Sequence, residues 1–111
     1  MSTYHPDTWV MIKFMHKGSP IYKILAGWGG SYLHGQSWKL NSGVTSVTED
    51  DTHYHFKGAS GSVYICHKRS YGFSGYTSQV FNSFVEQLRG QDETTMEPLD
   101  EETNFMELVY E

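Results

Sequence analysis

The sequence predicts a mainly β protein: a strongly bent, five-stranded small barrel followed by a C-terminal α-helix and an acidic tail. Short segments rich in β-branched and aromatic residues follow one another, separated by turns of Gly, Ser, Pro and Asp. The apolar period then changes once, from two residues to that of a helix. At 111 residues, the chain has the usual length of one domain. A barrel is favoured because closure removes exposed strand edges.

The first two strands are predicted at residues 8–16 and 21–28. In the first, side chains alternate between two faces, one with Val10 and Ile12 and the other with Trp9. A Lys-Gly-Ser-Pro turn joins the two strands. Glycines break or bulge the end of the second strand (Gly27, Gly29 and Gly30).

Three more strands are predicted at residues 38–49, 52–58 and 62–68. The first of these is interrupted at Ser42-Gly43. Such an interruption permits the sharp bend that small barrels need at their corners. Charged and small residues then form the turns that separate the last two strands.

A helix is predicted at residues 77–90, where apolar residues change to helical spacing (Val80, Phe81, Phe84, Val85 and Leu88). Thr77 or Ser78 can cap its start and Gly90 can end it. We expect its apolar stripe to cover a barrel opening or a neighbouring subunit. Residues 91–103 look like a linker, and the apolar segment 104–110 should dock as an extra strand or a short helix.

The charge is divided unevenly between two regions. Residues 1–90, the barrel with its helix, hold eight bases and five acids, whereas residues 91–111 hold eight acids and no base. A mildly basic body can attract polyanions, and the acidic tail, partly disordered or docking, can repel them or compete with them. The alternative is that the tail only keeps the protein soluble.

The sequence shows none of the motifs that carry familiar enzyme chemistry, such as a phosphate-binding loop or a nucleophile elbow. We therefore expect no enzyme and no cofactor. The single cysteine, Cys66, allows no intrachain disulfide and suits a reducing cytosol. Inside a strand it reads as a small core residue. No apolar run has the length of a membrane span, so we expect a soluble, cytoplasmic protein with no membrane partner.

His53 and His55 share one face of a predicted strand, so both imidazoles could reach one metal ion. His67 on the next strand could lie nearby. No third ligand is fixed by spacing, and the pair reads more simply as two exposed histidines. They are weak candidates, and we expect no metal site.

Aromatic and basic residues gather in or beside the predicted connections, where a barrel presents its binding surface. Rings stack on bases and cations pair with phosphates. The candidate nucleic-acid-binding residues are Tyr32, His34, Trp38, Lys39, Asn41, Lys57, Lys68 and Arg69. The alternatives are that Trp38 and Tyr32 pack in the core or at a subunit contact, and that Lys39 and Lys57 are simply solvated.

Residues 33–41, LHGQSWKLN, resemble the L-x-G-x-D-x-x-M-N run of the Sm-like RNA-binding family. Leu33, Gly35 and Asn41 match, Leu40 stands for the Met, and Ser37 replaces the Asp. Lys57-Gly58 is similar to the Arg-Gly that precedes the last strand of that family. The whole barrel region also looks like a family of small proteins from marine cyanophages and ocean metagenomes, which is similar to Sm-like proteins in fold.

This resemblance implies a non-enzymatic protein that binds RNA or single-stranded DNA, with a role in phage RNA or DNA processing in the cytoplasm of an infected bacterium. It also implies a homo-oligomer, a cyclic ring of about five to seven subunits, in which the fourth and fifth strands of neighbours pair. In such a ring Asn41 contacts a base edge, Lys57 lies beside a base or phosphate, and residues 29–41 form the pore lip.

A second hypothesis is an SH3-type protein-interaction barrel or a structural phage protein. The aromatic residues outnumber Lys and Arg, and an aromatic groove could take a peptide while the acidic tail docks on a basic partner. Nuclease-sensitive co-purification favours the first hypothesis, and nuclease-resistant association with a protein favours the second.

Overall fold

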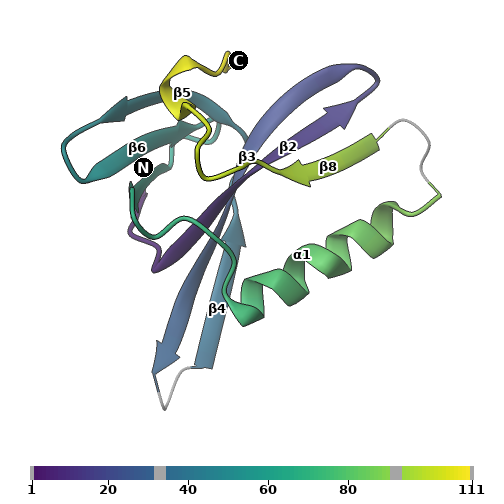
Figure 1. Cartoon of the computed structure of the whole chain (residues 1–111), viewed down its shortest axis with the longest axis horizontal. Helices are drawn as coiled ribbons and strands as arrows, with labels where there is room; N and C mark the ends of the chain where they lie inside the picture. Colours follow the sequence, from purple (N-terminus) through teal and green to yellow (C-terminus); the bar gives the residue numbers. More distant parts are fainter. Residues whose placement is uncertain (1, 32–34, 91–93, 111) are drawn as a thin grey trace.

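The protein is mainly β, as the sequence predicts (Figure 1). The computed structural model describes residues 2–31, 35–90 and 94–110. Sheet A has the strand order β1 (Thr3–Tyr4), β7 (Val63–His67), β6 (His53–Gly58) and β5 (Val44–Glu49). Sheet B has the order β4 (Gly35–Leu40), β3 (Ser19–Ser31), β2 (Thr8–His16) and β8 (Thr94–Pro98). The described residues therefore form two four-stranded sheets, where we expected a single five-stranded barrel, and these sheets do not close.

Strand β2 is buried on both faces, and the alternation read from the sequence is confirmed. Trp9 and Met11 point into the core between the two sheets. Val10 and Ile12 point to the other side of sheet B, into a second apolar cluster. The strand lies between β3 and β8, and an isolated parallel bridge joins its Trp9 to Tyr71 in the connection that follows β7. It is thus the strand around which both cores form.

The predicted bend at Ser42-Gly43 is present and carries the chain from one sheet to the other. The predicted strand 38–49 is divided into β4, which belongs to sheet B, and β5, which belongs to sheet A. Gly43 has φ 131°, a conformation that L side chains rarely adopt. Its carbonyl accepts a 2.8 Å hydrogen bond from the Ala59 N–H, which ties this corner to the end of β6.

Residues 29–37 lie outside the predicted strands, but those that the structure describes belong to strands. Strand β3 continues to Ser31, and β4 pairs with it from Gly35 onward, with an irregular register between Trp28 and Ser31. The glycines thus bulge the strand, as predicted, without ending it. The two strands form a hairpin that projects from the body of the molecule (Figure 1).

The helix α1 (Gly75–Leu88) begins two residues earlier than predicted. Its cap is Ser74 and not Thr77 or Ser78: the Ser74 hydroxyl accepts the Thr77 N–H, and the Thr77 hydroxyl accepts the Ser74 N–H. The apolar stripe packs on the Val10 and Ile12 face of sheet B. The helix therefore covers a sheet of its own chain, where we expected it to cover a barrel opening or a neighbouring subunit.

The C-terminal residues fold back over the body. Residues 94–98, expected to be part of a linker, form β8, which pairs antiparallel with β2. The segment 104–110 does dock, as expected, through the short helix η1 (Phe105–Glu107). Phe105 is 2 % exposed, and its ring lies 5.2 Å from that of Trp9 and 5.3 Å from that of Tyr71. We call residues 94–110 the C-terminal strap.

Candidate functional site

Three partly exposed side chains meet at the base of the projecting hairpin. The Lys39 ammonium of β4 lies 5.1 Å from the centre of the Tyr4 ring. The Tyr4 ring in turn contacts the Trp28 ring of β3 edge-on, with 6.2 Å between centroids. Lys39 is exposed, and both rings are half-buried, since they also pack on the core. We call Tyr4, Trp28 and Lys39 the hairpin-base cluster.

Neighbouring hydrogen bonds fix this cluster in place. The Trp28 indole N–H donates to the carbonyl of His5 at 3.0 Å. The Gly29 N–H donates to a carboxylate oxygen of Asp7 at 2.7 Å. The rings are therefore held before any ligand arrives, which lowers the entropy that binding costs. Asp7 places one negative charge beside the cluster and would disfavour a phosphate on its side.

Trp38 and Lys39 are neighbours in the sequence but lie on opposite faces of sheet B. The Trp38 ring meets the Phe84 ring of α1 edge-on, with centroids 5.4 Å apart, and is 40 % exposed. Successive side chains in a strand alternate between faces, so one surface cannot present both. Trp38 therefore belongs to the helix side, away from the hairpin-base cluster.

Asn41 is buried, with 5 % of its surface exposed. Its side-chain oxygen accepts a 2.8 Å hydrogen bond from the backbone N–H of Ile24. The backbone N–H of Asn41 donates to the Ile24 carbonyl at 3.0 Å. Its amide nitrogen Nδ2 has no partner among the described residues. In this arrangement Asn41 extends the β3 ladder into the corner and does not present its side chain to a ligand.

The remaining basic candidates lie on sheet A or at its end. Lys57 is exposed on β6, and Arg69 is exposed beyond the end of β7. The Lys68 ammonium is 2.8 Å from the Glu49 carboxylate, and this hydrogen bond raises the pKa of Lys68. The predicted set is thus divided between both sheets and does not converge on one lip. Tyr32 and His34 lie outside the described residues.

The histidine pair lies on the outer face of sheet A beside the turn that precedes it. The His55 Nε2 is 2.8 Å from one Asp50 oxygen, and the His53 ring contacts the His67 ring with centroids 4.8 Å apart. His67 is therefore near the pair, as the sequence suggested. In the part of the chain that the structure describes, no group of three or more His, Cys, Asp or Glu side chains is arranged to hold a metal ion.

Cys66 is fully buried, and the expectation that it is a small core residue is confirmed. Burial raises the pKa of its thiol, because the thiolate would lose its hydration. A thiol in this environment is a poor nucleophile at neutral pH.

Sequence reasoning missed two members of the hairpin-base cluster, Tyr4 and Trp28. Tyr4 lies in a two-residue strand that pairs parallel with β7, and so short a strand leaves no periodic signal. Trp28 was read only as the last residue of a strand. The proximity of both to Lys39 depends on long-range pairing that the sequence does not display.

Comparison with protein-family models, with curated proteins and with solved structures finds no match for this chain. Function must therefore be inferred from the residues of the site. Among the described residues, no helix is long and apolar enough to cross a membrane.

Proposed function

We propose that this chain is a non-enzymatic, Sm-like protein that binds single-stranded RNA or DNA at the hairpin-base cluster. The carrying observation is the Lys39 ammonium 5.1 Å over the Tyr4 ring, beside the Trp28 ring. Aromatic rings stack on unpaired bases of any sequence, and a nearby cation pairs with the phosphate between them. The excess of bases over acids in residues 1–90 supports attraction of a polyanion.

The proposal differs from the arrangement expected from the sequence in one respect. Both sides of β6 already have a neighbour, β5 on one side and β7 on the other. Neighbouring subunits therefore cannot pair through their fourth and fifth predicted strands without displacing a strand. A ring would instead join the two outer strands of sheet A, β5 of one copy with β1 of the next, and such head-to-tail pairing can close cyclically.

The first test is a fluorescence-anisotropy titration of the full chain with short U-rich RNA, A-rich RNA and single-stranded DNA, paired with light-scattering mass. We expect binding that weakens as salt rises, because phosphate contacts release counterions. Absence of binding to all three at low salt would overturn the proposal. If the protein binds but its mass is that of a monomer, the proposed binding site is supported and the proposed ring is contradicted.

A matched pair of variants locates the site. Lys39→Gln and Lys57→Gln remove the same charge from exposed lysines on different sheets. We expect Lys39→Gln to weaken binding about three- to tenfold and Lys57→Gln by less than about twofold. Tyr4→Leu keeps an apolar side chain but removes the stacking ring, and should weaken binding about fivefold or more. The reverse order for the two lysines would move the site to the outer face of sheet A.

A further inference from the structure

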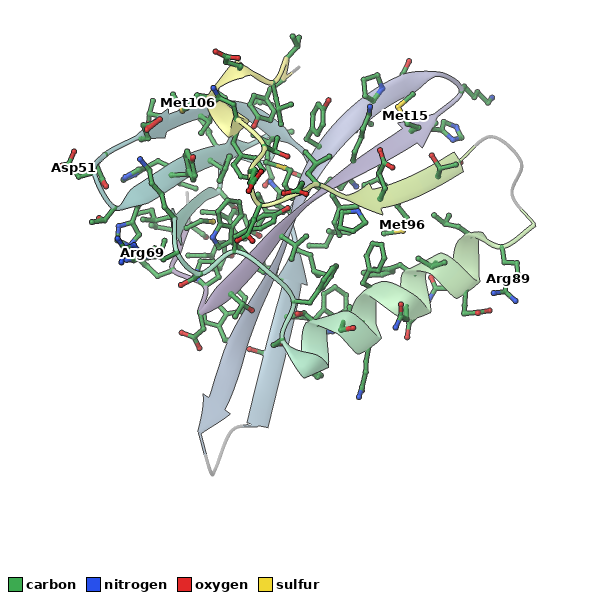
Figure 2. The ribbon with its side chains drawn as sticks, in the orientation of Figure 1. Met15, Asp51, Arg69, Arg89, Met96 and Met106 are labelled. Carbon is green, nitrogen blue, oxygen red and sulfur yellow. The ribbon has the colours of Figure 1, made fainter. Side chains whose placement is uncertain are left out.

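A groove of about 280 Å³ lies between the C-terminal half of α1 and strand β8. The helix contributes Val85 and Leu88 to its walls, its C-cap residue contributes Arg89, and β8 contributes Thr94, Thr95 and Met96. Figure 2 shows the Met96 side chain extending from β8 towards the helix. Val85 is 38 % exposed, so an apolar side chain on this wall stands open to solvent. This groove is on the opposite face of sheet B from the hairpin-base cluster.

One wall of the groove is a strand with a free edge. Strand β8 is the last strand of sheet B, and β2 occupies only one of its two sides. The Leu99 N–H donates to the Met11 carbonyl, and hydrogen-bonded pairs alternate along an antiparallel ladder. By that alternation the backbone N–H and C=O of Glu97 point towards β2. The backbone N–H and C=O of Met96 point the other way, to the edge of β8 that does not face β2. Within the described residues, no strand pairs with β8 along that outer edge.

Acidic residues outnumber basic ones in the stretch of sequence that contains both walls of the groove. Among the described residues between 86 and 102, a single base, Arg89, accompanies five acids (Glu86, Glu97, Asp100, Glu101 and Glu102). The Arg89 guanidinium is already paired, 2.9 Å from the Glu86 carboxylate. Met96 faces the helix, so Glu97, the next residue, faces the opposite side of the sheet. An added strand would thus meet apolar side chains on one face and a carboxylate on the other.

We propose that this groove binds an extended, basic segment of a partner protein, which adds to the free edge of β8 as a further strand. Apolar side chains of the segment point into the groove towards Val85, Leu88 and Met96. The alternate side chains, Lys or Arg, lie beside Glu97, where opposite charges on neighbouring strands attract each other. Backbone hydrogen bonds to β8 provide affinity, and the alternation provides selectivity.

The test uses the full-length protein, labelled with ¹⁵N, and an acetylated octapeptide of alternating Val and Lys. At about 1 mM peptide, which detects even weak binding, we expect amide shifts at Met96 and along the second half of α1. The Met96 amide should also become protected from hydrogen exchange. Val85→Lys places a repelling charge in the groove and should weaken binding about tenfold or more. Asn82→Lys, the same charge on an exposed position of α1, should change it less than about twofold.

Two further peptides separate strand addition from simple charge attraction. One has the same composition arranged as four Val followed by four Lys, and the other alternates Val and Glu. The proposal requires that both bind more weakly than the alternating Val–Lys peptide. Equal binding of the block peptide, or no shifts at Met96 at about 1 mM, would overturn it. A dimeric mass with Met96 protected before any peptide is added would also overturn it, since a second copy would then occupy the edge.

Discussion

Gly27 allows the first turn of α1 to approach strand β3. A Cβ atom at this position would lie 2.5 Å from the Thr77 methyl carbon and 3.0 Å from the Thr8 hydroxyl. Thr77 is 1 % exposed and also belongs to the helix cap, so it has little freedom to move away. The absence of a side chain at Gly27 thus determines how the helix is seated on sheet B.

We predict that Gly27→Ala lowers the free energy of unfolding by about 1–3 kcal/mol, because the added methyl overpacks the contact with Thr77. Thr77→Ser removes the obstructing methyl and keeps the capping hydroxyl, so it should restore part of the loss in the double variant. Urea denaturation measures both. Gly75→Ala is the control, since a Cβ there meets nothing within 4 Å and should be neutral or stabilising. If Gly27→Ala is as stable as the parent, the helix is not seated in this way.

Asp50 organises the turn between β5 and β6. One carboxylate oxygen is 2.8 Å from the His55 Nε2, and the other accepts the N–H groups of Thr52 and His53. These hydrogen bonds, that of His55 first, hold the pKa of Asp50 well below its ordinary value of 3.8. A carboxyl group with a lowered pKa stabilises the fold above its unfolded pKa, and that contribution is lost as pH falls towards the folded value.

We therefore predict that Asp50→Asn lowers the urea midpoint at about pH 5 to 7 and that the difference from the parent shrinks below about pH 4. Asp51→Asn, at the exposed neighbouring carboxylate, provides the matched comparison. A difference from the parent that stays constant from about pH 6 to pH 2 would contradict an ionisation effect at Asp50.

At the scale of elements, the C-terminal strap completes the core between the sheets. Phe105 packs against Trp9, Tyr54, Phe56 and Tyr71. The Tyr71 hydroxyl donates to the Leu99 carbonyl at 2.6 Å, and the Tyr110 hydroxyl donates to the Phe105 carbonyl at 2.7 Å. The strap is therefore part of the folded unit, although its sequence is the most acidic part of the chain.

Phe105→Ala should cost about 3–5 kcal/mol of stability, because it removes a buried ring and leaves a cavity among other rings. Val109→Ala is the control: Val109 is 76 % exposed, so the same kind of truncation should change stability by less than about 0.5 kcal/mol. Chemical denaturation followed by tryptophan fluorescence reports both, since Trp9 contacts Phe105 directly. Equal stability of the two variants would show that the strap does not close the core.

The sequence predicted those elements whose signals are local. The alternation in β2, the bend at Ser42-Gly43 and the helical stripe of α1 each depend on a few neighbouring residues, and each is present. Strands β1 and β8 escaped prediction, because a two-residue strand and a Thr-rich acidic strand are recognised only through the strands that they pair with. The same reason explains why Asn41 was read as a ligand contact: its burial is set by a corner that joins two sheets.

At the scale of the whole molecule, the acidic C-terminal region is part of the folded body and is not a free tail attached to a basic body. The acids of the strap are held against the body by β8 and Phe105, so they contribute a fixed negative field. Removal of residues 91–111 would also remove Phe105 from the core, so a truncated chain cannot separate the electrostatic effect of the tail from its structural effect. Substitution of exposed acids leaves the core intact and makes the separation possible.

We predict that the triple variant Asp100→Asn, Glu101→Gln, Glu102→Gln binds single-stranded oligonucleotides about two- to fivefold more tightly at 50 mM salt, because three repelling charges are gone. Asn at position 100 keeps the side-chain oxygen that accepts the Glu102 N–H at 2.9 Å, so the turn should persist. Anisotropy titrations at about 50 and 500 mM salt measure the effect, which screening should remove at the higher concentration. A gain that persists at high salt would point to a direct contact at the strap. Unchanged affinity at low salt would mean that the strap acids do not compete for the oligonucleotide site.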